Sequence, residues 1–163
     1  MTPRSLKKRM GYVAYLLQII KEIWRKKAPT YDVDFKCDGK KYHGTYTFII
    51  VSSADRIAGI NNIYKDIKLD DNQFEILCCS LTRKIDVIRS ASYLLKGEIT
   101  KAPGFEFYRA SNFEIDFHNS DHMHWCIDGE ELEKATDKYE FDNTAKINLL
   151  IPRKKAEELF LKK

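Results

Sequence analysis

The stretch YDVDFKCDGKKYHGTYTFIIV, residues 31–51, carries the pattern that decides the fold of this 163-residue chain. Two runs rich in β-branched and aromatic residues, YDVDFKC and KYHGTYTFIIV, lie on either side of Asp38 and Gly39. An Asp-Gly pair readily adopts the positive φ values of a tight turn between antiparallel strands. The stretch therefore predicts a β-hairpin.

Upstream, residues 6–27 repeat apolar side chains at three- and four-residue steps and are followed by Pro29, which predicts an opening helix over residues 1–27. This segment has eight Lys or Arg residues and one acidic residue, whereas the remainder has 20 basic and 23 acidic residues. A solvated helix face is the favoured explanation of the charge. Contact with an anionic membrane surface is left open, and nucleic acid is not an expected partner.

Downstream, the long polar run at 52–72 precedes the strand-like FEILCCS. Residues 81–97 then place Ile85, Ile88, Ala91 and Leu95 on one helical face before Gly97, a good helix terminator. Five further runs are typical of strands, and the tail at 153–163 has helical character after Pro152. The five runs are FEFYRA, NFEIDF, HMHWCI, KYEF and AKINLLI.

This order of elements predicts an α+β protein, mostly an antiparallel β-sandwich with two flanking helices and a C-terminal helix. The length suits a single domain over residues 1–163, and 44% hydrophobic with 32% charged residues is a globular composition. No apolar run approaches the roughly 18 residues that cross a bilayer, and the first residues do not look like a secretory signal. We therefore expect a cytoplasmic protein. Its four cysteines lack a C-x-x-C spacing and are expected to be buried, reduced thiols.

Three stretches together resemble one family. They are YTFIIVSSADRIAGINNIYKDIKLDDNQFEIL at 46–77, IDVIRSASYLLKGEI with PGFEFYRASNFEI, and WCIDGEE at 125–131 with the closing INLLIP. In this order they are similar to the substrate-binding, C-terminal domain of the diacylglycerol and sphingosine kinases and their bacterial relatives. The resemblance implies the C-terminal domain of the NAD kinase/diacylglycerol kinase-like fold, which receives a lipid alcohol.

The family's nucleotide site is marked by a Gly-Gly-Asp-Gly-Thr loop, which this sequence lacks. The resemblance therefore implies a fragment of a larger kinase, inactive alone, whose N-terminal domain binds ATP. Phosphoryl transfer needs donors and cations around the ATP phosphates, and most of these would come from that domain. A non-catalytic lipid-binding or interaction module is the alternative. The identity of the lipid and the oligomeric state, including a homodimer, stay open.

Within the resemblance, Glu130 is either the proton acceptor for the lipid hydroxyl or a ligand of a catalytic Mg²⁺. Both roles suit a carboxylate, and the sequence does not choose between them. Asp128 would orient the turn or reach the metal and nucleotide, and Gly129 would let the backbone bend sharply. An ordinary hairpin turn is the alternative interpretation of Asp-Gly-Glu alone.

A structural Mg²⁺ is also implied, held by the Asp71 carboxylate and the carbonyls of Lys68 and Gln73. Asn72 replaces the family's glycine in this loop and is the non-glycine residue that best tolerates a left-handed backbone. A bare acidic turn is an equally good interpretation. Gly59 keeps a loop glycine of the family and is interpreted as a source of backbone freedom.

Two further groups of side chains are candidate sites. His122, His124 and Cys126 alternate and could form a metal trio on one strand face, but exposed polar positions opposite a core-facing Trp125 and Ile127 explain them better. Aromatic residues on several strands could line a lipid pocket or pack in the core. These are Tyr46, Phe48, Phe105, Phe107 and Tyr108.

Overall fold

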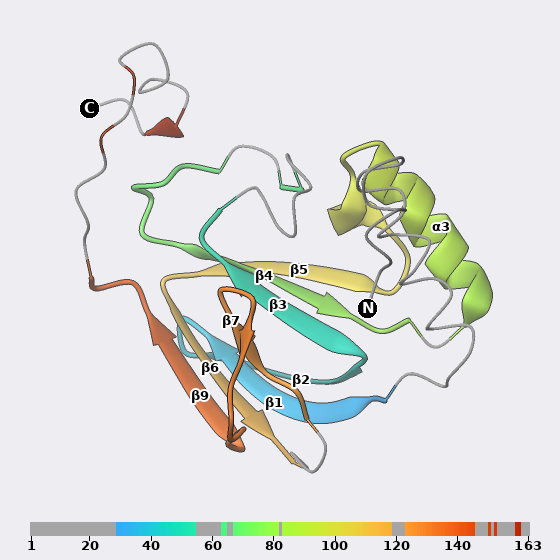
Figure 1. Ribbon diagram of the computed structural model, residues 1–163, viewed down its shortest axis with the longest axis horizontal. Helices are drawn as coiled ribbons and strands as arrows, with labels where there is room; N and C mark the ends of the chain where they lie inside the picture. The colour runs from blue at the N-terminus through green and yellow to red at the C-terminus, as the bar shows by residue number, and fades with distance from the viewer. Residues whose placement is uncertain are drawn as a thin grey trace.

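Two antiparallel sheets make up the body of the computed structural model (Figure 1). The structure describes residues 29–54, 63–64, 67–81, 83–118, 123–145, 150, 152 and 159–160. One sheet has the order β2-β1-β6-β9 and the other β3-β4-β5, and a short β7-β8 hairpin stands apart. Every pairing among these strands is antiparallel, which confirms the predicted sheet type.

The predicted hairpin is present and joins β1 (Tyr31–Cys37) to β2 (Lys40–Tyr46). Asp38 and Gly39 form its turn with φ values of 47° and 81°, the left-handed region in which glycine is unstrained. The Asp38 carboxylate accepts hydrogen bonds of 2.9 Å from the backbone N–H groups of both Ser111 and Asn112. The hairpin tip is therefore fastened to the chain between two later strands.

The second predicted strand run is in fact two strands. It bends at Thr47, so that β2 belongs to the larger sheet and β3 (Phe48–Ser52) to the smaller one. Ser111 makes the same transition between β5 (Phe105–Ala110) and β6 (Asn112–Phe117). Two single-residue corners therefore connect the sheets.

The space between the sheets holds the main core, as expected of a sandwich. Alternate residues of the strands point into it, because side chains of a strand alternate between its two faces. β4 (Phe74–Cys79) is buried along most of its length. The buried residues of this core are Val33, Phe35, Cys37, Tyr46, Ile76, Cys78, Ala110, Phe113, Ile115, Phe117 and Met123.

Helix α3 (Lys84–Leu95) and the short helix η1 (Ile99–Lys101) lie on the side of the smaller sheet that faces away from the larger one (Figure 1). Gly97 ends the helix with a φ of 66°, as expected. The apolar face that the sequence suggested is not the buried one, because Ile85 and Ile88 are about half exposed, whereas Val87 is buried beside Cys79. The periodicity of the sequence predicted the helix correctly but did not predict which of its faces is buried.

Other expectations fall outside the described residues. These include the opening helix at 1–27 and nearly all of the terminal helix at 153–163. Three of the four cysteines are buried thiols as expected, but Cys126 is exposed. None of the helices that the structure describes is both long and apolar enough to cross a membrane.

Candidate functional site

The Asp128-Gly129 pair forms the turn between β7 (Cys126–Ile127) and β8 (Glu130–Glu131). Their φ values of 51° and 89° are both positive, which is the backbone of a tight two-residue hairpin turn. Asp128 and Glu130 are exposed on either side of Gly129. The turn therefore presents two accessible carboxylates, with no side chain between them to block a close approach.

A hollow of about 350 Å³ lies beside this turn, between the edge strand β3 and the hairpin. Ile49 and Val51 line it from β3, Trp125 and Ile127 from the hairpin, and Phe141 from β9 (Lys138–Asp142). A volume near 300 Å³ is the lower end of the range for small-molecule sites, which are mostly apolar with a few polar groups at the edge. The hollow is large enough for a small apolar group, and Asp128 is one of the two polar residues in its lining.

Aromatic contacts hold Trp125 in this position. Its ring stacks on Tyr139 at 4.4 Å between centroids and meets Phe117 edge-on at 5.9 Å. The Trp125 carbonyl also accepts a 2.8 Å hydrogen bond from the backbone N–H of Leu132, which closes the base of the hairpin. The turn is thereby attached to the main core rather than projecting freely from it.

The aromatic residues that could either line a lipid pocket or pack in the core do not gather at this hollow. Tyr46 and Tyr108 lie at the main core, and their hydroxyls donate 2.7 Å hydrogen bonds to Glu106. Phe105 and Phe107 pack on the helix side of the smaller sheet, and Phe48 contacts Phe105 edge-on. Core packing explains four of the five, whereas Phe48 is 36% exposed. The aromatic residues that line the hollow are Trp125 and Phe141.

The segment before the turn also differs from the sequence prediction. Ile127 was expected to face the core, but it is 52% exposed and lines the hollow. His124 pairs through Nδ1 with the Glu131 carboxylate, and His122 is outside the described residues. Among the described residues, neither His124 nor Cys126 belongs to a group of three potential metal ligands.

The Asp71 loop is held by a side chain far away in sequence. Asp71 Oδ1 accepts a 3.0 Å hydrogen bond from the Gln73 backbone N–H, and Oδ2 lies 2.5 Å from Arg109 Nη2. Asn72 has a φ of 55°, the left-handed backbone for which it was considered suitable. The cation beside Asp71 is thus Arg109, and a metal ion here would have to share the carboxylate with it. Gly59 lies outside the described residues.

Sequence reasoning missed Glu75 and Arg109. Cross-strand register places them directly opposite each other on β4 and β5, and Glu75 is completely buried. Burial raises the pKa of the Glu75 carboxyl, and the nearby Arg109 guanidinium partly opposes that shift. A glutamate inside a run of buried strand residues was the available signal.

Comparison with known proteins shows the family to which this fold belongs. Residues 3–147 match the family described as the YegS C-terminal NAD kinase beta sandwich-like domain. Proteins named diacylglycerol kinase from Staphylococcus saprophyticus and Staphylococcus epidermidis are 23% and 25% identical over 129 residues, 79% of this chain. The chain spans only 41% and 40% of their lengths.

Solved structures show the same fold. Two crystal structures of Bacillus anthracis proteins whose names contain diacylglycerol kinase superpose with TM-scores of 0.59 and 0.56, each at 18% identity. They cover 86% and 84% of this chain and 45% of each of those chains. The family match, which covers most of the residues, shows that this chain belongs to the YegS C-terminal, NAD kinase beta sandwich-like domain family of the diacylglycerol kinase-like lipid kinases.

Proposed function

We propose that this chain is the acceptor side of an ATP-dependent lipid kinase that phosphorylates a lipid hydroxyl such as that of diacylglycerol. The observation that carries the proposal is that a mostly apolar hollow extends to Asp128, the first residue of the Asp128-Gly129-Glu130 turn. A lipid alcohol has the matching shape, since its chain can enter the hollow while its hydroxyl stays at the rim. The relatives that are named diacylglycerol kinase support the same class of substrate.

Glu130 is the group assigned to the acceptor hydroxyl, as general base or as a ligand of Mg²⁺. An exposed carboxylate can take either role, because a base must come within hydrogen-bond reach of the hydroxyl and Mg²⁺ prefers hard oxygen ligands. Asp128 is assigned to orienting the turn or to the metal and nucleotide. When bound, Mg²⁺ neutralises charge that develops on the transferred phosphoryl group. ATP itself would be held mainly by another domain of the full-length protein, at an interface with this turn.

The second predicted ion, at Asp71 with the carbonyls of Lys68 and Gln73, fits the structure less well. Both Asp71 oxygens have partners, and Arg109 already supplies positive charge to the loop. No part of the proposed reaction depends on this ion. Because the proposed substrates are membrane lipids, the protein would act from the cytoplasm at an anionic membrane surface. The basic segment at 1–27 would contribute to binding that surface.

The test is lipid phosphorylation by the full-length protein. Glu130→Gln removes the carboxylate but keeps the size of the side chain, and we expect turnover to fall by about 100-fold, within the range for general acid–base groups. Glu133→Gln is the matched control, because Glu133 is exposed beyond the hairpin, and it should leave turnover unchanged. Full activity of Glu130→Gln on a panel of lipid alcohols would refute the role of Glu130. Lipid binding with no turnover in any preparation would favour the binding module instead.

A further inference from the structure

A second group of side chains lies on the outer face of the larger sheet, away from the Asp128 turn. Asp34 on β1 is directly opposite His43 on β2, and His118 follows the end of β6 with its backbone N–H bonded to the Asp32 carbonyl at 3.0 Å. Strand alternation puts Asp32 and Asp34 on the same face. Three strands therefore deliver two histidines and two aspartates to one corner of the sheet.

The side chains converge on Asp34. His43 Nδ1 lies 2.9 Å from Asp34 Oδ1, and His118 Nε2 lies 3.0 Å from Asp34 Oδ2. One ligand atom from each of the three residues falls within 4.8 Å of the other two. All three side chains are about half exposed, so an ion can reach them from solvent.

We propose that Asp34, His43 and His118 form a binding site for a divalent transition-metal ion of the zinc class. Zinc binds imidazole nitrogen and carboxylate oxygen at about 2.0–2.2 Å in a tetrahedral arrangement, which separates ligand atoms by roughly 3.3 Å. The two contacts with Asp34 would open by a few tenths of an ångström to admit the ion, and small side-chain rotations would bring the two imidazole nitrogens, now within 4.8 Å of each other, to that spacing. Three protein ligands leave the fourth position to water.

Asp32 supplies the support that metal-binding histidines usually have. His43 Nε2, the ring nitrogen that does not face Asp34, lies 3.4 Å from Asp32 Oδ1. A carboxylate on the far nitrogen fixes the tautomer and orientation of a ligating imidazole. Thr45 Oγ1, at 3.4 Å, holds the same Asp32 oxygen.

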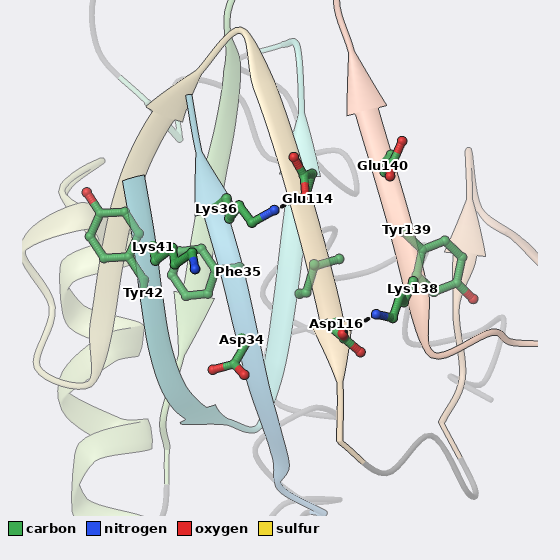
Figure 2. Close-up of a pocket in the computed structure, with 11 residues that line it drawn as sticks. Asp34, Phe35, Lys36, Lys41, Tyr42, Glu114, Asp116, Lys138, Tyr139 and Glu140 are labelled. Atoms are coloured by element: carbon green, nitrogen blue, oxygen red, sulfur yellow. Dashed lines mark hydrogen bonds and ion pairs between the residues drawn. The ribbon is translucent and has the colours of Figure 1, made fainter. Parts of the chain in front are cut away.

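The charges around the site favour a cation there. Figure 2 shows Asp34 on a face where two lysines, Lys36 and Lys138, turn towards other acids. Lys138 Nζ lies 2.7 Å from Asp116, and Lys36 Nζ lies 2.5 Å from Glu114. The charges within each of these two ion pairs cancel. Asp32 and Asp34 together carry the two negative charges that match a divalent ion. The ion would clamp β2 and β6 to β1, independently of the proposed kinase function.

The experiment is calorimetric titration of Zn²⁺ into the full chain at pH 7. We expect one ion per chain, with affinity falling on the order of 100-fold in Asp34→Asn, His43→Ala and His118→Ala, and about tenfold in Asp32→Asn. His124→Ala and Cys126→Ser are the matched controls. Both side chains are exposed and of types that can bind zinc, but they lie at the β7-β8 hairpin, away from the proposed site. They should keep wild-type affinity.

Unchanged affinity in the His43 and His118 variants, or loss of binding in Cys126→Ser, would overturn the proposal. Circular dichroism identifies any variant that fails to fold. For such a case, imidazole NMR of the wild-type chain gives the same answer. One equivalent of Zn²⁺ should shift the ring signals of His43 and His118 and leave that of His124 in place, and the reverse pattern would refute the site.

Discussion

The Nε atom of Arg109 lies 3.3 Å from Oε1 of Glu75, a carboxylate that is completely removed from solvent. The same guanidinium reaches Asp71 through Nη2, so one arginine ties the loop before β4 to the sheet. A buried ion pair contributes little net stability compared with a hydrophobic pair, but losing one partner leaves an uncompensated charge. The pair therefore makes the loop depend on Arg109.

Replacing Arg109 with Met should destabilise the fold by about 3 kcal/mol, the lower end for breaking a buried pair, because Arg109 itself is one-third exposed. Urea unfolding of the chain measures the loss. The double variant Arg109→Met with Glu75→Gln should recover part of it, since the buried charge is then absent. Equal stability of the single and double variants would show that Arg109 does not compensate the buried charge of Glu75.

Glu75 should also make stability depend on pH. Because burial raises the pKa of Glu75, the folded state holds its proton more tightly than the unfolded state, and this contribution to stability is present below the unfolded value of about 4.3. It is lost as pH rises through the folded pKa. Unfolding free energies of wild type and Glu75→Gln, measured from pH 4 to pH 7, should therefore shift in favour of the variant as pH rises. A constant difference would contradict the raised pKa.

Asp38 should contribute to stability beyond its place in a turn. Asp38→Ala removes the acceptor of two backbone N–H groups, at Ser111 and Asn112, and we expect a loss of about 1–2 kcal/mol in chemical denaturation. Asp38→Asn keeps an acceptor oxygen and a residue that tolerates positive φ, so it should lose less. Identical losses in the two variants would mean that the hydrogen bonds contribute nothing measurable.

Filling the hollow should reduce use of the lipid. Ile49→Trp places a large ring at its wall, and in the full-length protein we expect at least a tenfold rise in KM for the lipid and little change in KM for ATP. Ile88→Trp, on the exposed face of α3, is the control and should behave like wild type. Equal KM values for lipid in the two variants would exclude the hollow as the acceptor site.

Much of the framework was readable from local patterns. The Asp38-Gly39 hairpin, the strand FEILCCS, helix α3 and the Asp128-Gly129 turn all follow from alternation, periodicity and turn chemistry within a few residues. The bend at Thr47 was not readable, because the run around it is equally strand-like on both sides. Its cause is tertiary: the Thr47 backbone N–H bonds to the carbonyl of Cys79, at the far end of β4.

The helix face and the candidate sites show the same limit. Asp86 is buried on α3, where Arg83 pairs with its carboxylate at 2.7 Å. Hydrophobic periodicity places charged residues on the exposed face of a helix and so does not predict this burial. The contacts of Arg109 with Asp71, and of His118 with Asp34, join residues 38 and 84 positions apart. Only strand register brings them together, and register is set by the whole sheet.

The corners at Thr47 and Ser111 have a consequence for how the domain opens. Each is the midpoint of a continuous ribbon, β2-β3 or β5-β6, that gives one strand to each sheet. One sheet cannot unfold while the other stays intact, because each ribbon contributes a strand to both sheets. Backbone amides in the two sheets should therefore exchange with solvent hydrogen as a single cooperative unit, while those of the short, exposed β7-β8 hairpin exchange faster. The proposed acceptor turn can then adjust to a substrate without loosening the sandwich that holds it.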